Sequence, residues 1–186
     1  AASTWLSELV LRDNSVQDGG VSVLARALGA CSSLTLLDLS QNMVSDMGAR
    51  ALAEGMATSA SLKQLFLGFN RISNAGACAL AEVVGRLTYV GLGSNQIGDA
   101  GASALAAGLA RSATLREVRL DDNQIADGGA AAFGDAVGRN TSIAELHLDG
   151  NQITDVGAAA LATGVAASKS LRELYLEDNQ IRERGA

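Results

Sequence analysis

The feature of this sequence that most restricts its fold is an asparagine that returns at a nearly constant interval. The series consists of Asn14, Asn42, Asn70, Asn95, Asn123, Asn151 and Asn179. All steps between successive members are equal except the one from Asn70 to Asn95, which is three positions shorter. A fixed period of roughly 20–50 residues indicates a stack of similar supersecondary units, in which each unit buries its apolar face against its neighbours.

The residues around each of these asparagines keep a common register. Aliphatic residues stand five and three positions before the asparagine and two positions after it, and glycine stands six positions after it. A polar residue, usually aspartate, stands four positions after it. In the unit around Asn42 these positions hold Leu37, Leu39, Val44, Asp46 and Gly48. The shared register predicts the same local structure in every unit.

Each unit is predicted to form a short strand, a turn and a helix. Alternating leucines before the asparagine place apolar side chains on one face of a strand. In the second unit, Ala49, Leu52, Ala53 and Met56 recur at helical spacing and predict a helix with a buried stripe. The aspartate at the Asp46 position is expected to be the helix N-cap. The asparagine side chain is expected to bond backbone groups of the turn that burial would leave unsatisfied.

The complete pattern is Leu-x-x-Leu-x-Leu-x-x-Asn-x-Ile-x-Asp-x-Gly-Ala, and residues 33–60 (SLTLLDLSQNMVSDMGARALAEGMATSA) form one full unit. Over the whole chain this pattern resembles the ribonuclease-inhibitor-type leucine-rich-repeat family. That family also includes the Ran GTPase-activating protein, the sensor domains of NOD-like receptors and some axonemal proteins. The ribonuclease inhibitor itself alternates asparagine with cysteine at the strand end. Every unit here has asparagine, which argues against a true ribonuclease inhibitor.

The resemblance implies an α/β fold, a horseshoe-shaped solenoid of seven repeats, each the length of the unit at residues 33–60. A parallel β-sheet would form its concave face and α-helices its convex face. Packed helices lie ~8–10 Å apart and paired strands ~4.7–4.9 Å apart, so stacked units curve toward the strands. Residues 1–186 are expected to form a single domain. Because neither end resembles a polar capping unit, the sequence predicts a segment of a longer protein.

The composition narrows the environment and the possible ligands. No apolar run approaches the ~20 residues that span a bilayer, and no signal peptide precedes the repeats, so no membrane contact is expected. Two cysteines, Cys31 and Cys78, lack the spacing of a disulfide framework or a metal site, which favours a reducing, cytoplasmic location. We expect no cofactor and no metal ion, because the single histidine, His147, has no second histidine with which to share a site.

The residues two, four and six positions before each asparagine are expected to point to the concave face. Acidic residues gather in the later units: residues 1–93 hold 7 acidic and 6 basic residues, and residues 94–186 hold 13 and 8. Such a field attracts basic partners and repels nucleic acid, although a solvated face without a partner is the alternative. The candidate partner-binding residues of these units are Glu117, Arg119, Asp121, Glu145, His147, Asp149, Glu173, Tyr175 and Glu177.

A small aromatic group forms the second candidate contact surface. Phe66, Phe69 and Tyr89 surround three glycines, at positions 68, 91 and 93, and are expected to line a shallow apolar pocket. Aromatic anchors of this kind dominate many protein interfaces. The alternative is that one or two of the rings fold onto the scaffold, beside a unit that is three residues short before Leu87. Phe133 occupies a helix-core position and is expected to be buried.

No set of residues predicts catalysis. Residues 121–129 (DDNQIADGG) resemble a calcium loop, but Ile125 stands where an oxygen ligand is required. The chain has no phosphate-binding loop with a lysine and no serine aimed at His147. We therefore expect a non-enzymatic scaffold for protein–protein interaction, whose partner is another protein with a basic and apolar surface.

Two other functions remain open from the sequence. The helical face carries mostly alanine, glycine and scattered charges, which fits a structural subunit of a large assembly such as an axoneme. The resemblance to the Ran activator suggests a GTPase-activating regulator, but that suggestion rests on fold resemblance alone. The functional residues of the activator have no match in this sequence.

Overall fold

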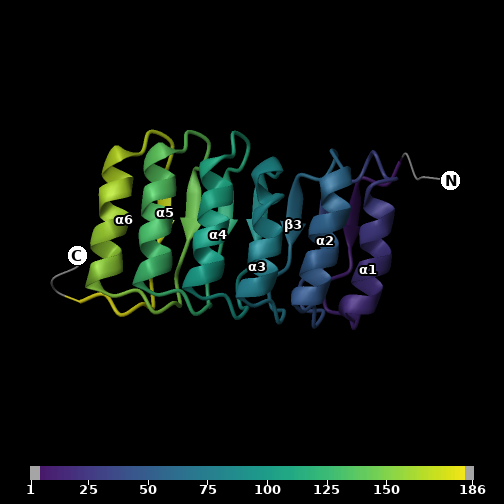
Figure 1. Cartoon of the computed structure of the whole chain (residues 1–186), viewed down its shortest axis with the longest axis horizontal. Helices are drawn as coiled ribbons and strands as arrows, with labels where there is room; N and C mark the ends of the chain where they lie inside the picture. The colour runs from purple at the N-terminus through teal and green to yellow at the C-terminus, as the bar shows by residue number, and fades with distance from the viewer. Residues whose placement is uncertain (1–4, 183–186) are drawn as a thin grey trace.

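The computed structural model describes residues 5–182, which form a single seven-stranded parallel sheet with a row of helices along one side (Figure 1). The strands lie side by side in the order of the sequence, β1-β2-β3-β4-β5-β6-β7. The strands are β1 (Glu8–Val10), β2 (Leu36–Asp38), β3 (Gln64–Phe66), β4 (Tyr89–Gly91), β5 (Glu117–Arg119), β6 (Glu145–His147) and β7 (Glu173–Tyr175). The helices are α1 (Gln17–Leu28), α2 (Asp46–Thr58), α3 (Asn74–Ala81), the 3-10 helix η1 (Val84–Arg86), α4 (Asp99–Ala110), α5 (Asp127–Arg139) and α6 (Asp155–Ala167). This arrangement confirms the predicted α/β solenoid.

The strand register keeps the period of the sequence. Leu37 lies opposite Leu9 and Leu65, so the middle residue of every strand joins one apolar column that faces the helices. The residues on either side of this column face away from the helices, as the alternation of a strand requires. Between β3 and β4, Gln64 pairs with Tyr89, so the shorter step of the sequence causes no slip in the columns. The predicted alignment of these residues in columns along the strands is therefore confirmed.

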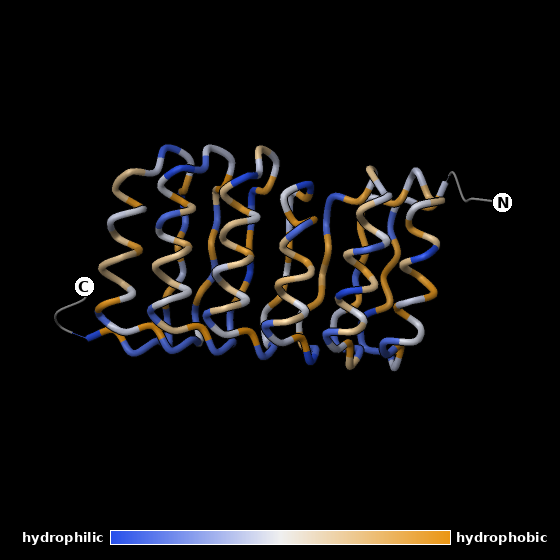
Figure 2. The backbone as a smooth tube through the Cα atoms, viewed as in Figure 1, coloured by the Kyte–Doolittle hydropathy of each residue, from blue (hydrophilic) through white to orange (hydrophobic). Residues whose placement is uncertain are grey.

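The core lies between the sheet and the helices. In the second unit Leu37 in the strand, Leu39 just after it and Leu52 in the helix have no exposed surface. Figure 2 shows apolar and polar residues alternating along each unit, with apolar stretches repeated from one unit to the next. Phe133 is fully buried, as predicted, and fills the position that leucine takes in other units. Removing one such side chain costs about 2–5 kcal/mol in a packed core.

The recurring asparagines join neighbouring units. Asn95 donates from Nδ2 to the carbonyls of Leu67 and Leu92, each at 3.0 Å. Its Oδ1 accepts from the amide of Ile72 at 2.9 Å. The predicted bonds to the turn are confirmed, and the same side chain also satisfies backbone groups of the preceding unit.

The recurring aspartates act differently from the expectation. Asp46 is the first residue of α2, and the N-cap is Ser45, whose hydroxyl accepts from the amide of Met47. The Asp46 carboxylate instead reaches the next unit, where Oδ1 accepts from the amides of Ser73 at 2.7 Å and Gly76 at 2.9 Å. Its Oδ2 accepts from the Ser73 hydroxyl at 2.6 Å. The N-cap prediction was wrong because the free amides nearest this carboxylate belong to the following helix.

This link explains the recurring glycine. A Cβ atom on Gly76 would lie 2.6 Å from Asp46 Oδ1, so a side chain there would displace the carboxylate. Burial raises the pKa of Asp46, but the hydrogen bonds from Ser73 and Gly76 outweigh it and lower the pKa overall. The corresponding polar residue and glycine of the seventh unit, Glu183 and Gly185, lie outside the described residues.

The short unit loses helix rather than strand. Helix α3 has 8 residues, against 13 in α2 and 12 in α4, and the 3-10 helix η1 makes the return to β4. The three missing residues therefore shorten the helical side, while the sheet continues unbroken. The predicted position of the shortening, before Leu87, is confirmed.

Candidate functional site

The acidic cluster surrounds a buried imidazole. The cluster consists of Glu117, Glu145 and Asp149 around His147; Glu117 lies on β5, Glu145 and His147 on β6, and Asp149 just after β6. His147 is 8% exposed although it lies on the strand face. The ring of Tyr175, one strand on, stacks on the imidazole with centroids 4.2 Å apart and planes 8° apart. The stack fixes the plane of the imidazole and covers one of its faces.

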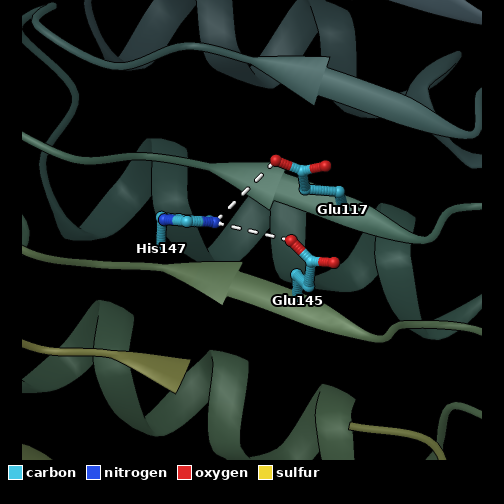
Figure 3. Close-up of side chains that lie close together, drawn as sticks. All are labelled: Glu117, Glu145 and His147. Carbon is cyan, nitrogen blue, oxygen red and sulfur yellow. Dashed lines mark ion pairs between the residues drawn. The ribbon is translucent and has the colours of Figure 1, made fainter. Parts of the chain in front are cut away.

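The two imidazole nitrogens face different carboxylates, and Figure 3 shows the two glutamates on the Nε2 side. Nε2 lies 3.8 Å from Oε1 of Glu117 and 4.0 Å from Oε2 of Glu145. Nδ1 lies 4.0 Å from Oδ1 of Asp149. The Nε2 atom is buried and has no hydrogen-bond partner among residues 5–182. A buried polar atom without a partner is rare and costly, so this atom marks the centre of the cluster as a place that favours a ligand.

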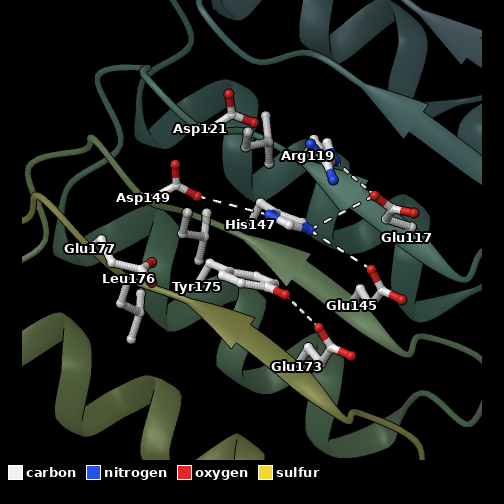
Figure 4. Close-up of polar contacts among 12 residues, drawn as sticks. Glu117, Arg119, Asp121, Glu145, His147, Asp149, Glu173, Tyr175, Leu176 and Glu177 are labelled. Atoms are coloured by element: carbon white, nitrogen blue, oxygen red, sulfur yellow. Dashed lines mark hydrogen bonds and ion pairs between the residues drawn. The ribbon is translucent and has the colours of Figure 1, made fainter.

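Two further polar contacts hold the surrounding side chains (Figure 4). Arg119 donates from Nε to Oε1 of Glu117 at 2.7 Å, and this hydrogen bond raises the pKa of Arg119. The Tyr175 hydroxyl donates to Oε2 of Glu173, which raises the pKa of Tyr175. The predicted cationic residue of this face is therefore already paired with a glutamate, so the cluster presents a net negative charge to solvent.

Asp121 connects the acidic cluster to the aromatic group. Burial raises the pKa of its carboxyl group, and the neighbouring charge of Asp149 raises it further. Its carboxylate lies over the bare backbone of Gly93, where a Cβ atom would collide with it. Glu177, the next residue in the same column after Asp149, is exposed beyond β7. The two predicted surfaces thus form one continuous face.

The aromatic group lines a shallow hollow of about 280 Å³. Phe66 and Tyr89 stack with ring centroids 4.3 Å apart and planes inclined by 29°. Tyr89 lies over Gly91, and its burial raises the pKa of its hydroxyl to about 12. Phe69 stands at the rim and is 56% exposed.

The hollow differs in chemistry from the predicted apolar pocket. Arg12, Ser40, Arg119 and Asp121 contribute to its lining together with the three aromatic residues and the glycines. One wall is therefore polar and charged, because the neighbouring columns bring long side chains across the short glycine positions. A ligand for this hollow needs both apolar surface and a polar group.

The sequence did not predict that two glutamates and the histidine would meet. Glu145 lies directly opposite Glu117 in the sheet, and His147 is on the same face two residues later. One ligand atom from each residue can be chosen so that all three lie within 4.8 Å of one another. The sequence feature that could have predicted this meeting is the pair Glu117 and Glu145 in one column of the strand face, with His147 in the neighbouring column. Sequence reasoning passed over it because it looked for a second histidine.

The helices show no membrane-spanning character. Among the described residues, none of the helices has the length and apolar character that crossing a membrane requires.

Comparisons with known proteins agree with this geometry. A family model described as Leucine Rich repeat matches residues 2–25, 30–53, 58–81, 87–106, 111–134 and 139–162, more than half of the chain. Each matched segment is shorter than the full repeat unit, and the seventh strand lies beyond the last of them. None of the curated proteins matches the sequence.

Several solved structures share the fold at low sequence identity. An internalin from Listeria monocytogenes is 20% identical with a TM-score of 0.57, and the match covers 86% of this chain but only 46% of the internalin. The tropomodulin C-terminal domain from Caenorhabditis elegans is 19% identical with a TM-score of 0.61, covering 75% of this chain and 86% of that domain. Leiomodin-1 actin-binding site 2 is 13% identical with a TM-score of 0.51, covering 89% of this chain and 84% of that structure.

Proposed function

The chain belongs to the leucine-rich-repeat family, and from that premise we propose that it is a non-enzymatic scaffold that binds another protein through its strand face. The observation that carries the proposal is the continuity of this face. The aromatic hollow around Phe66 and Tyr89 runs into the acidic cluster around His147 by way of Asp121. Apolar anchors beside a charged field are typical of interfaces that combine affinity with steering.

The chemistry of this face favours a partner with a basic and apolar surface. Glu117, Glu145 and Asp149 are partly exposed, and Arg119 offsets only one of their charges. Negative charge in this arrangement raises the association rate of a cationic surface and opposes nucleic acid. A side chain that enters the aromatic hollow would add apolar burial next to the charged wall.

The structural relatives support protein binding as a class of function. The leiomodin-1 structure is described as an actin-binding site, which illustrates that a stack of this fold can serve to bind a protein. At 13% identity the likeness is one of fold, so it does not extend to actin for this chain. The regular period with one helix per unit supports assignment to the ribonuclease-inhibitor type within the family. A cytoplasmic location remains a prediction.

Charge reversal on the two faces of the molecule tests the proposal. The strand-face variant carries Glu117→Lys, Glu145→Lys and Asp149→Lys. The matched control carries Glu54→Lys, Glu82→Lys and Asp135→Lys, which changes the net charge equally at exposed positions of the helical side. Both variants are checked for folding by circular dichroism and compared with wild type by proximity labelling in the native source.

The two outcomes are distinct. We expect the strand-face variant to lose a set of basic proteins that the wild type and the control both label. A label set that survives the strand-face reversal would contradict the assignment of this face.

A second candidate function, a structural subunit that docks through its helices, is favoured by exposed apolar residues on the helical side. Val23, Met47 and Val156 are 66%, 73% and 69% exposed on α1, α2 and α6. A contiguous exposed apolar patch marks an interaction surface, and Val23 and Met47 lie on α1 and α2, which pack against each other, whereas Val156 lies on the last helix of the row. The test is a variant that carries Val23→Ser, Met47→Ser and Val156→Ser. This function would be supported if that variant loses labelled proteins while the strand-face variant labels the same proteins as wild type.

A further inference from the structure

We propose that Glu117, Glu145 and His147 form a binding site for a divalent metal ion of the zinc class on the strand face. The inference goes beyond the scaffold function, because it concerns a ligand of the folded chain itself and needs no partner protein. It rests on the geometry of three side chains on two neighbouring strands, β5 and β6. We call these residues the Glu–His site.

The sheet fixes the positions from which the three ligands approach. Glu117 and Glu145 are paired residues of neighbouring strands, and His147 follows Glu145 on the same face. Nε2 of His147 lies 3.8 Å from Oε1 of Glu117 and 4.0 Å from Oε2 of Glu145. Tetrahedral zinc with ligands at ~2.0–2.1 Å places ligand atoms ~3.3 Å apart. Each nitrogen–oxygen pair therefore closes by about 0.6 Å, a movement within the reach of a glutamate side chain.

The imidazole is aimed at this position and gains a partner there. His147 is 8% exposed, and its Nε2 is buried without a hydrogen-bond partner among the described residues. Leaving such an atom unsatisfied destabilises the fold, and two carboxylates facing each other repel. A cation between them removes both penalties, since Nε2 supplies its lone pair and the glutamates supply negative oxygens.

The surroundings of the imidazole match those of a metal ligand. Metal-bound histidines usually donate the other ring N–H to a carboxylate, which fixes the tautomer. Oδ1 of Asp149 lies 4.0 Å from Nδ1, so a small rotation of Asp149 completes this bond. Tyr175 holds the ring plane by stacking at 4.2 Å.

Arg119 is the competitor at this site. Its Nε bonds Oε1 of Glu117, the same oxygen that faces the imidazole. A metal ion and this guanidinium therefore compete for one oxygen, although Glu117 can offer its second oxygen to Arg119. Arg119 is 46% exposed along its side chain and is free to move toward solvent.

The ligand set selects the class of ion. One imidazole nitrogen and two carboxylate oxygens suit zinc, cobalt, nickel or manganese, whereas calcium and magnesium prefer oxygen alone. Three protein ligands leave a fourth coordination position, which water can fill. The site should therefore bind Zn²⁺ and Co²⁺ in preference to Mg²⁺ and Ca²⁺.

The test uses the whole chain, produced without a polyhistidine tag so that His147 is its single histidine. Zn²⁺, Co²⁺, Mg²⁺ and Ca²⁺ are titrated at pH 7.5, and the imidazole nitrogens are followed by long-range ¹H–¹⁵N spectra. We expect one equivalent of Zn²⁺ to shift the Nε2 resonance while Nδ1 keeps its proton. Magnesium and calcium at the same concentration should leave both resonances in place.

Variants separate the site from the general acidic field. Calorimetry should show that His147→Gln and Glu145→Gln each weaken Zn²⁺ binding by about 10-fold or more. The matched control is Glu173→Gln, which removes the same charge from the same column one strand on, and it should change affinity far less. Arg119→Met should tighten binding, because it removes the competitor. Circular dichroism without metal confirms that each variant is folded.

Three results would overturn the proposal. The first is an unshifted imidazole in wild-type protein at one equivalent of Zn²⁺, a readout that needs no variant. The second is equal weakening by Glu145→Gln and Glu173→Gln, which would indicate diffuse attraction by the acidic face. The third is equal binding of Ca²⁺ and Zn²⁺.

Discussion

Removing the Asp46 carboxylate should weaken the contact between the second and third units and lower the stability of the fold. Asp46 accepts three hydrogen bonds from the next unit, two of them from amides at the start of α3. Replacing a helix-capping acceptor with alanine costs about 0.5–2 kcal/mol, and hydrogen bonds to a charged group are worth about 1.5–3 kcal/mol each before screening. Since Asp46 is partly exposed, we expect Asp46→Ala to lower the free energy of unfolding by about 2 kcal/mol.

The chain contains its own reference for a milder change. Asn74 occupies the equivalent position one unit later, and its Oδ1 accepts from the amides of Gly98 at 2.8 Å and Gly101 at 2.9 Å. An amide oxygen is therefore sufficient to accept from the two backbone amides in this unit, where Gly98 replaces the serine and no hydroxyl needs an acceptor. Asp46→Asn should cost about 1 kcal/mol or less, because it keeps two bonds and loses only the charge and the acceptor for Ser73.

The pH dependence gives an independent check. The pKa of Asp46 is lowered in the folded state, so its stabilisation is complete above the ordinary pKa of about 3.9 and is lost as the pH falls through the lower folded value. The difference between wild type and Asp46→Asn should therefore be constant near neutral pH and shrink below pH ~3.9.

The assay is urea unfolding followed by circular dichroism, with Asp135→Ala as an exposed control expected to stay within about 0.5 kcal/mol of wild type. Equal small losses for the alanine and asparagine variants of Asp46, or a difference between wild type and Asp46→Asn that grows in acid, would refute the capping role.

Three further predictions follow from contacts described above. Asn95→Ala should cost about 1–3 kcal/mol in urea unfolding, because it takes the acceptor from the buried Ile72 amide, while the carbonyls of Leu67 and Leu92 keep Asn70 and Asn123 as donors. Gly76→Ala should lower the free energy of unfolding by about 1–3 kcal/mol, because the added methyl group displaces the Asp46 carboxylate. In the same assay Gly19→Ala in α1 should raise it by about 1 kcal/mol, because an added Cβ there meets nothing within 4 Å. Tyr89 should ionise at about pH 12 in an absorbance titration. Because its pKa is raised in the folded state, the free energy of unfolding should fall as the pH rises from 10 toward that value. Ionisation of both tyrosines near pH 10 in folded protein would contradict the burial of Tyr89.

The fold was predictable from the sequence because every unit repeats the same pattern of apolar, polar and glycine positions. A one-residue error in any unit would have broken the register with the other units, so the strand columns and the buried positions of Leu37, Leu52 and Phe133 followed from the sequence alone. The shortened third unit was equally visible, as the reduced step from Asn70 to Asn95. Local periodicity determines each of these features.

The candidate site was predictable only as a set of columns. The period placed Glu117, Glu145 and His147 on one face, but side-chain rotation decides which atoms meet, and that depends on neighbours such as Tyr175 and Arg119. The capping role of Asp46 was missed for a related reason. Sequence analysis assigns a cap to its own helix, whereas this carboxylate serves α3, the helix of the following unit.

The joints between units also give the stack a direction. From the second unit onward each asparagine bonds a carbonyl of the preceding unit, as Asn95 does with Leu67, while the aspartates of the described units reach forward to backbone amides of the following unit, as Asp46 does. When the chain leaves the ribosome from its N-terminus, the last folded unit already carries a carboxylate or amide oxygen. That oxygen can accept from the first amides of the helix in the next unit. The newly made asparagine then closes the turn of the unit before it. Synthesis and folding can thus advance together, one unit at a time, with each completed unit serving as the template for the next.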